Sequence, residues 1–227
     1  MSAGVVTGLT READCLSVIP IDERPPVRCS GARPEAAARA AESLINLGCK
    51  ALVSFGMAGG LEPSLAPGAL VVADTVVGAD GQRFNTASSW RAALAESLQD
   101  HLTIAGGPIA GSDHALTSPT AKAALHAESG AVAVDMESHK VAAVADASDV
   151  PFLVVRAVSD PCTRSIPGWV LNGVGADGHI RYGAMAAGLV CHPWDIPAVI
   201  GLSGESNLAL DALRRVCSLI GPRFGLP

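Results

Sequence analysis

The chain has 227 residues and a formal net charge of −6, from 22 acidic and 16 basic side chains; 49% of its residues are hydrophobic and 17% are charged. This composition excludes a disordered chain, and the scattered basic residues argue against nucleic acid as a partner, because phosphate binding needs a concentrated positive patch. No apolar run approaches the roughly 20 residues that cross a bilayer, and the amino terminus lacks a secretory signal, so we expect a cytoplasmic protein without a transmembrane segment.

Short β-branched runs alternate with alanine-rich segments of helical period, which indicates an α/β sheet with helices on its faces. In chain order we expect strands at 4–8 and 27–30, a helix at 35–47, strands at 51–55 and 69–77, helices at 90–99 and 119–127, a strand at 132–134, a helix at 137–147 and a strand at 151–158. Residues 161–180 predict an ordered loop or lid, followed by helices at 181–189 and 197–220. Because no repeat or linker interrupts this pattern, we interpret residues 1–227 as a single domain.

The strand at 151–158 is almost wholly apolar, with Arg156 as its one charged residue, which places it in the centre of the sheet. It leads into Ser159 and Asp160, so a carboxylate stands at the edge where open α/β sheets bind ligands. A partly shielded aspartate has a raised pKa and can donate a proton to a leaving group. The alternative is a structural role for Asp160, either as a cap or as a partner of Arg156.

A second carboxylate, Glu137, stands where a short strand turns into a helix. The helix dipole favours its ionised form, which can accept two hydrogen bonds at once, as the paired hydroxyls of a ribose would offer. Asp135 competes for this role. For either acid taken alone, capping of the helix is the simpler interpretation.

A glycine-rich segment at 56–60 follows a predicted strand and is expected to form a turn whose backbone approaches a ligand. It lacks the lysine of a Walker loop and the G-x-G-x-x-G spacing, so by itself it does not define a site. The side chains at 112–114 include Ser, Asp and His, but sequence neighbours cannot form a hydrolytic triad. The cysteines and histidines have no metal-like spacing, and we expect no metal site.

In combination, three segments resemble the family 1 purine nucleoside phosphorylases and, within them, the methylthioadenosine/adenosylhomocysteine nucleosidases. They are Gly-Met-Ala-Gly-Gly-Leu-Glu-Pro at 56–63, Val-Asp-Met-Glu-Ser at 134–138 and Val-Arg-Ala-Val-Ser-Asp at 155–160. The stretch at 176–183 is similar to the hopanoid-associated phosphorylases, a subgroup thought to release adenine from adenosylhopane. The resemblance implies a three-layer α/β fold with a mixed, twisted central sheet flanked by helices, and a homo-oligomer without an organic cofactor.

The resemblance also implies roles for individual residues. Asp160 matches the acid that protonates N7 of the departing purine, and Ser159 a residue beside the base. Glu137 matches the carboxylate that holds the 2′ and 3′ hydroxyls of the ribose, and Met136 the residue beneath the sugar. These roles suit the chemistry, because breaking the C1′–N9 bond builds positive charge on the sugar and negative charge on the purine.

The segment expected near an attacking water departs from the nucleosidase pattern. In nucleosidases a glycine precedes a run of glutamates, one of which orients the water. Here Gly8 opens the matching segment, Ala13 falls at the water-orienting position, and Glu12 is one residue early. This departure speaks against hydrolysis.

The segment expected near a phosphate departs from the phosphorylase pattern as well. Gly56, Met57 and Ala58 match the loop near the nucleophile, but Met57 stands where phosphorylases carry a serine for phosphate. Arg11 is a candidate for the missing anion contact, because a guanidinium binds phosphate in a fork. The alternative for Arg11 is a solvated side chain.

We therefore expect an enzyme that cleaves the N-glycosidic bond of an adenine nucleoside and releases adenine, by phosphorolysis with phosphate as co-substrate. The expected substrate is adenosylhopane, whose lipid 5′ substituent would lie in an apolar channel formed by residues 166–171 and Trp194. One alternative is hydrolysis of methylthioadenosine or adenosylhomocysteine. Another is a catalytically silent nucleoside-binding protein.

Overall fold

The computed structural model describes residues 2–221 and 224–226. Its helices are α1 (Thr10–Ala13), α2 (Pro34–Asn46), α3 (Ser88–Leu98), α4 (Pro119–Ser129), α5 (Ser138–Ala147), α6 (Tyr182–Cys191) and α7 (Ile196–Ile220), with the 3-10 helices η1 (Asp14–Val18), η2 (Gly168–Gly173) and η3 (Pro193–Asp195). Its strands are β1 (Ala3–Thr7), β2 (Val27–Cys29), β3 (Ala51–Gly60), β4 (Leu70–Val72), β5 (Thr75–Val77), β6 (Arg83–Asn85), β7 (Ile104–Ala105), β8 (Pro108–Gly111), β9 (Ala133–Asp135) and β10 (Phe152–Asp160).

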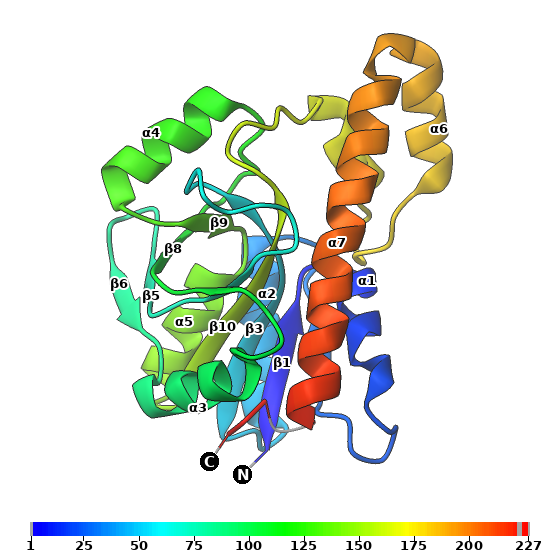
Figure 1. Cartoon of the computed structure of the whole chain (residues 1–227). Helices are drawn as coiled ribbons and strands as arrows, with labels where there is room; N and C mark the ends of the chain where they lie inside the picture. The colour runs from blue at the N-terminus through cyan, green and yellow to red at the C-terminus, as the bar shows by residue number, and fades with distance from the viewer. Residues whose placement is uncertain (1, 222–223, 227) are drawn as a thin grey trace.

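The strands join in one mixed sheet with β3 at its centre (Figure 1). Along one edge, β3 pairs in parallel with β10. The other edge is shared: β1 pairs in parallel with residues 51–54, and β9 pairs antiparallel with Gly59 and Gly60. Among the described residues, the stretch at 55–58 therefore has no strand partner on this edge, and the carboxyl ends of β1 and β9 approach it from opposite directions.

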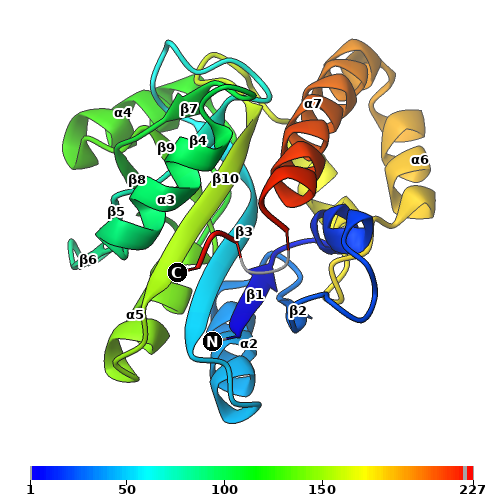
Figure 2. The ribbon, with the colours of Figure 1, turned by 60° about the horizontal axis from the view of Figure 1, so that its bottom comes forward.

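Helices cover both faces of the sheet. α2 and α5 pack together on one face, and α3 and α7 lie on the other (Figure 2). Side chains of β3 alternate between the two layers, with Val53 and Phe55 in the core beneath α7 and Leu52 in the core beneath α2. The expected α/β architecture, a mixed central sheet flanked by helices, is confirmed.

Two of the predicted elements are wrong. The glycine-rich segment at 56–60 does not form a turn, because it continues β3 and pairs with β10 and then β9. The long strand expected at 69–77 is two strands: β4 pairs with β10 and β7, whereas β5 pairs with β6 and β8. Strands β6, β7 and β8 were not predicted, since runs of this length are too short to show a period.

The carboxyl-terminal part of the chain extends beyond the end of the sheet. α6 and the start of α7 form a hairpin at one end of the molecule (Figure 1). Within the described ranges no single helix is long and apolar enough to cross a membrane, although α6 and Pro193–Ile220, which meet at 111°, reach that composition together. The cytoplasmic location and the single domain expected from the sequence stay predictions.

Candidate active site

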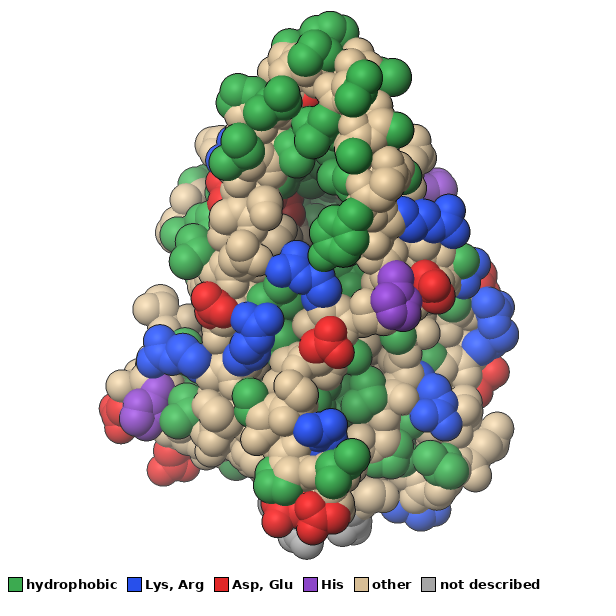
Figure 3. All heavy atoms as spheres, turned by 90° about the vertical axis from the view of Figure 1, so that its right-hand side faces the viewer, with side chains coloured by type: hydrophobic (Ala, Val, Ile, Leu, Met, Phe, Trp, Pro, Cys, Tyr) green, Lys and Arg blue, Asp and Glu red, His purple; other side chains and the backbone are tan. Residues whose placement is uncertain are grey.

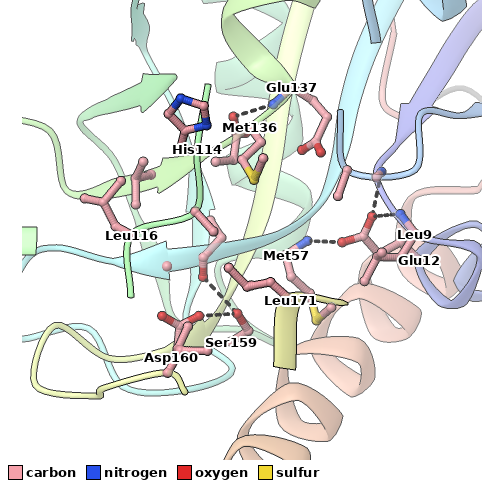
Figure 4. A pocket seen from close by; sticks show the side chains of 18 residues that line it. Leu9, Glu12, Met57, His114, Leu116, Met136, Glu137, Ser159, Asp160 and Leu171 are labelled. Atoms are coloured by element: carbon pink, nitrogen blue, oxygen red, sulfur yellow. Dashed lines mark hydrogen bonds between the residues drawn. The ribbon is translucent and has the colours of Figure 1, made fainter. Parts of the chain in front are cut away.

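A cavity of about 220 Å³ lies at the unpaired stretch of β3, between the carboxyl ends of β1 and β9. Seven of the nine site residues expected from the sequence line it, namely Gly8, Met57, Ala58, Met136, Glu137, Ser159 and Asp160. Gly56 and Arg11 do not. Figure 4 shows Glu12 and Glu137 on one side of the cavity and Ser159 and Asp160 on the other, with Met57 between them. The two carboxylates singled out in the sequence therefore face one common space.

Asp160, at the end of β10, is held by a buried lysine. Lys122 of α4 donates from Nζ to Asp160 Oδ2 at 2.5 Å and to the carbonyl oxygen of Pro161 at 2.9 Å. Ser159 Oγ donates to Asp160 Oδ1 at 2.7 Å. Burial raises the pKa of Asp160, and Lys122 and Ser159 limit the rise. The partner of Asp160 is thus Lys122 rather than Arg156, and the sequence pattern contained no signal for Lys122.

The two acids at the start of α5 divide their roles. Asp135 Oδ1 accepts hydrogen bonds from the backbone N–H groups of Glu137 at 3.1 Å and Ser138 at 2.9 Å, so Asp135 caps the helix. The buried Arg156 joins both acids, with Nε 2.7 Å from Asp135 Oδ2 and Nη2 3.2 Å from Glu137 Oε2. Capping by Asp135 leaves the Glu137 side chain free to face the cavity.

The pKa of Glu137 departs from the expectation based on the helix dipole. Burial, reinforced by the negative charges of Asp135 and Glu12, raises it from 4.5 to about 8, although Arg156 acts in the opposite direction. Glu137 therefore holds a proton more readily than a solvated glutamate. A ribose hydroxyl would meet a carboxyl group that can both donate and accept.

Glu12, which the sequence comparison placed one residue early, lies in the cavity. Its Oε2 accepts hydrogen bonds from the backbone N–H groups of Gly8 and Leu9, and its Oε1 accepts one from Met57, all at 2.8 Å. The side chain is buried, and burial raises its pKa. Ala13 does not line the cavity. The start of α1 at Thr10, which the pattern did not reveal, turns Glu12 rather than Ala13 inward.

Two glycines leave room for these carboxylates. A Cβ atom on Gly56 would lie 2.6 Å from Glu12 Oε2 and 2.7 Å from Arg156 Nη1. A Cβ atom on Gly8 would lie 2.8 Å from Glu137 Oε1. Gly56 therefore leaves space for the Glu12 and Arg156 side chains, although it does not line the cavity. Both glycines are required by close approach of charged side chains.

Arg11 does not reach the cavity. Its Nη2 donates to Asn207 Oδ1 on α7 at 2.8 Å, outside the residues that form the cavity wall. The anion contact expected of Arg11 stays a prediction, and this structure gives the side chain a partner on α7 instead. The contact with α7 instead ties α1 to the carboxyl-terminal helix.

The cavity is lined by acidic side chains and by no lysine or arginine among the described residues. Glu12, Asp135, Glu137 and Asp160 all line it, whereas the nearby cations Arg156 and Lys122 are fully buried behind the wall and paired with these acids. Each of these acids that is ionised stabilises positive charge nearby and repels anions. Residues 2–221 and 224–226 contain no group of three His, Cys, Asp or Glu side chains placed to hold a metal ion.

We expect the raised pKa of Glu137 to make folding stability pH-dependent. The folded chain keeps a proton that the unfolded chain releases near 4.5, so the free energy of unfolding should fall as pH rises from there through about 8. In Glu137→Gln this fall should be shallower, with a remainder from Glu12 and Asp160, whose pKa values burial also raises. Urea unfolding at several pH values measures the slope. The exposed Glu128→Gln should keep the full slope, and an equally steep fall in Glu137→Gln would contradict the assignment.

Comparison with known proteins agrees with this architecture. The family profile of the phosphorylase superfamily matches residues 27–172. The 5'-methylthioadenosine/S-adenosylhomocysteine nucleosidases of Mycobacterium bovis and Mycobacterium tuberculosis are each 29% identical to the chain, in an alignment that covers 50% of the chain and 60% of either relative. The chain thus spans less than two thirds of the length of these curated relatives.

Solved structures share the fold. The 5'-methylthioadenosine/S-adenosylhomocysteine nucleosidase of Neisseria meningitidis, in complex with methylthio-immucillin-A, has a TM-score of 0.74 at 18% identity, covering 97% of this chain and 98% of that one. The futalosine hydrolase of Helicobacter pylori has a TM-score of 0.68 at 20% identity, covering 95% and 97%. The expected nucleoside phosphorylase-like fold is confirmed, and the chain belongs to the phosphorylase superfamily.

Proposed function

We propose that this chain is an enzyme that hydrolyses the N-glycosidic bond of an adenine nucleoside and releases adenine. The observation that carries the proposal is the placement of Asp160 on one wall of a single cavity and of Glu12 and Glu137 on the opposite wall. The nucleosidase relatives support the choice of an adenine nucleoside. No metal or organic cofactor enters the proposed reaction.

Asp160 is the proposed general acid. Cleavage of the C1′–N9 bond leaves negative charge on the purine, and a proton delivered to N7 lets the base depart as neutral adenine. The raised pKa of Asp160 favours the protonated form that this step needs, and Lys122 and Ser159 fix the direction of the carboxyl group. Leu116, His114 and Ser159 on the same side of the cavity would surround the base.

Glu137, Met136 and Glu12 would act on the sugar side. Glu137 is placed to hold the ribose hydroxyls, with Met136 beside it. The Glu12 carboxylate on this wall would stabilise the positive charge that builds on the ribose in the transition state. Glu12, with its raised pKa, would take a proton from water as the water oxygen attacks C1′. The proton given to N7 and the proton taken from water balance, so the reaction consumes only water.

Water suits the site better than phosphate does. The N–H groups of Gly8, Leu9 and Met57 converge as they would on a bound anion, but the Glu12 carboxylate already occupies them. No lysine or arginine among the described residues lines the cavity to offset the charge of phosphate. The phosphorolysis expected from the sequence stays a prediction, and this arrangement favours hydrolysis.

The candidate adenine nucleosides differ in their 5′ substituent, so the cavity wall near that position bears on the choice between them. Ile166 and Leu171 line the cavity on the side of η2, and they would contact an apolar group at the 5′ position. This wall suits a methylthio group as well as a longer chain. Adenosylhopane, the substrate expected from the hopanoid-associated resemblance, stays a prediction, as does the homo-oligomer.

An adenine-release assay tests the function. Purified chain is incubated with 5'-methylthioadenosine, with and without phosphate, and free adenine is quantified. We expect equal release in both conditions, as hydrolysis requires. Release only with phosphate would replace hydrolysis by phosphorolysis, and nucleoside binding without release would indicate a silent binding protein.

We expect Lys122→Met to change the pH dependence of this reaction. Loss of the cation removes the interaction that lowers the pKa of Asp160, so the pKa should rise and the alkaline limb of the kcat/KM profile should move to higher pH. Breaking a buried ion pair also lowers the free energy of unfolding by about 3–5 kcal/mol. The loss is smaller here to the extent that Asp160 becomes protonated. Lys140→Met, which breaks the surface pair with Glu35, is the matched control and should change neither the pH profile nor the stability. An unmoved pH profile in Lys122→Met would refute the positioning role.

A further inference from the structure

The loop at residues 112–117, between β8 and α4, forms the cavity wall on the side proposed for the purine base. Its residues 114–116 line the cavity, and Figure 4 shows two of their side chains there. A backbone hydrogen bond of 2.8 Å from Ser112 to the carbonyl oxygen of Asp135 ties the start of the loop to β9. At its end, the N–H of Ile166 donates to the loop at 2.9 Å. Between these two ends, the conformation of the loop depends on its side chains.

One side chain of α5 is bonded to this loop. His139, the second residue of α5, has Nε2 3.1 Å from Asp113 Oδ1. Because an ionised carboxylate only accepts hydrogen bonds, Nε2 carries a proton and donates it. The next residue of the helix, Lys140, pairs with Glu35 of α2 at 2.8 Å instead. The contact of α5 with the Asp113 side chain is therefore made by His139.

Packing alone does not explain a histidine at position 139. The residue is 7% exposed, and its ring lies against Gly111, where a Cβ atom would be 2.4 Å from Cγ and from Nδ1. Nδ1 is buried without a hydrogen-bond partner in the part of the chain that the structure describes. A buried polar atom without a partner lowers stability, so an apolar ring would suit this position better. The bond to Asp113 gives the histidine a purpose that packing does not.

The first turn of α5 reaches two walls of the cavity. Glu137, at its N-cap, faces the side proposed for the sugar, and His139 bonds to the loop on the side proposed for the base. Side chains two residues apart on a helix point in different directions, so one rigid turn can serve both walls. The helix therefore sets the position of the base wall relative to the ribose contact.

Another part of the cavity wall is held in a different way. η2 contributes Leu171 to the wall, and its Trp169 ring packs on Gly188 of α6, where a Cβ atom would lie 2.3 Å away. Figure 3 shows hydrophobic side chains gathered at this end of the molecule, formed by α6 and the start of α7. A change that loosens the loop at 112–117 would leave this apolar packing as it is.

We propose that His139 is a positioning residue, which holds the loop at 112–117, through Asp113, in the conformation that contacts the purine base. The inference rests on the proposed function, because that function places the base against this loop. A loop that adopts other conformations binds the base only while the wall is formed, so the apparent affinity falls by that fraction. The contacts of Glu12 and Glu137 with the sugar do not pass through the loop.

Separate binding of the two reaction products tests this role. Isothermal titration calorimetry measures the affinity for adenine and for 5-methylthioribose. We expect His139→Phe and Asp113→Ala each to bind adenine about threefold to tenfold more weakly, as loss of one hydrogen bond implies, and to bind 5-methylthioribose with unchanged affinity. His139→Gln, whose amide nitrogen takes the place of Nε2, should recover most of the affinity for adenine. The double variant should be no weaker than either single variant, because both changes remove the same bond.

Two further variants keep the test independent of folding. Asp113→Ala changes a side chain that is 55% exposed, so it breaks the bond without disturbing the core. The matched control is His179→Phe, at an exposed histidine beside Asp177, and it should bind both products like the unchanged chain. Unfolding by urea is measured for each variant, and we expect His139→Phe to be no less stable, because the unpartnered Nδ1 is gone.

Three results would overturn the positioning role. They are adenine binding that His139→Phe and Asp113→Ala leave undiminished, equal weakening for both products, and an unchanged chain that binds no adenine. A chain that binds adenine and responds to the variants as expected, but releases none from 5'-methylthioadenosine, would refute the proposed function. The positioning of the base wall by His139 would then stand without the hydrolysis.

Discussion

Replacing Asp160 by asparagine should lower the rate of adenine release by about 10²–10⁴-fold, the usual contribution of a general acid. The amide keeps the shape of the carboxyl group and the contact with Ser159, but it has no acidic proton for N7. Affinity for the nucleoside should change little. Single-turnover release of adenine measures the first effect, and the shift of the melting temperature with bound nucleoside measures the second.

Asp160→Asn also leaves the Lys122 ammonium buried without its carboxylate, and loss of folding could be mistaken for loss of chemistry. The double variant Asp160→Asn with Lys122→Met removes both charges and should fold while remaining inactive. Asp146→Asn, on the exposed end of α5, is the control and should release adenine at the normal rate. A rate in Asp160→Asn within tenfold of the unchanged chain would mean that another group protonates the base.

Replacing Glu12 by glutamine should have an effect of the same size, again about 10²–10⁴-fold, because the amide cannot take a proton from water. It should also reveal the nucleophile. Removing the negative charge that occupies the N–H groups of Gly8 and Met57 weakens the repulsion of phosphate, so any phosphate-dependent release should increase rather than fall. The measurement is adenine release by Glu12→Gln with and without phosphate.

Glutamine offers one carbonyl oxygen where the carboxylate has two, so some backbone N–H groups of the site lose their acceptor, at about 1–3 kcal/mol each. Unfolding by urea should therefore be measured beside the kinetics. Glu23→Gln, on the exposed turn after η1, serves as the control for both. Full phosphate-independent activity in a folded Glu12→Gln would exclude Glu12 as the base.

The strands and helices that depend on local pattern were predictable. β10 is apolar from Phe152 to Val158 except for Arg156, and α2 begins at a proline, so both were placed within a few residues. The glycine-rich end of β3 was not, because its extended form depends on pairing with β9 and β10, strands that are distant in sequence. A period in the sequence reports on one strand and not on its neighbours.

The same distinction holds at the site. Asp160 and Glu137 were found because each stands at the carboxyl end of a predicted strand, a position that the sequence alone defines. Glu12 accepts a hydrogen bond from Met57, which is 45 residues away in the sequence. Lys122 donates one to Asp160, which is 38 residues away. Such partners become visible only when the chain is folded, and the pKa of Glu137 likewise depends on burial and on Asp135 and Glu12.

The gap in strand pairing along one edge of β3 affects how strongly the backbone at the site is held. On the edge of β3 that carries β1 and β9, the described stretch at 55–58 has no strand partner, and the hydrogen bond from the Met57 N–H to Glu12 Oε1 joins β3 to α1 there. A bound nucleoside that contacts both walls would add a reversible connection between the two sides of this gap. Occupied and empty protein should then differ in how readily the Met57 amide exchanges its hydrogen with solvent, with slower exchange when the site is filled.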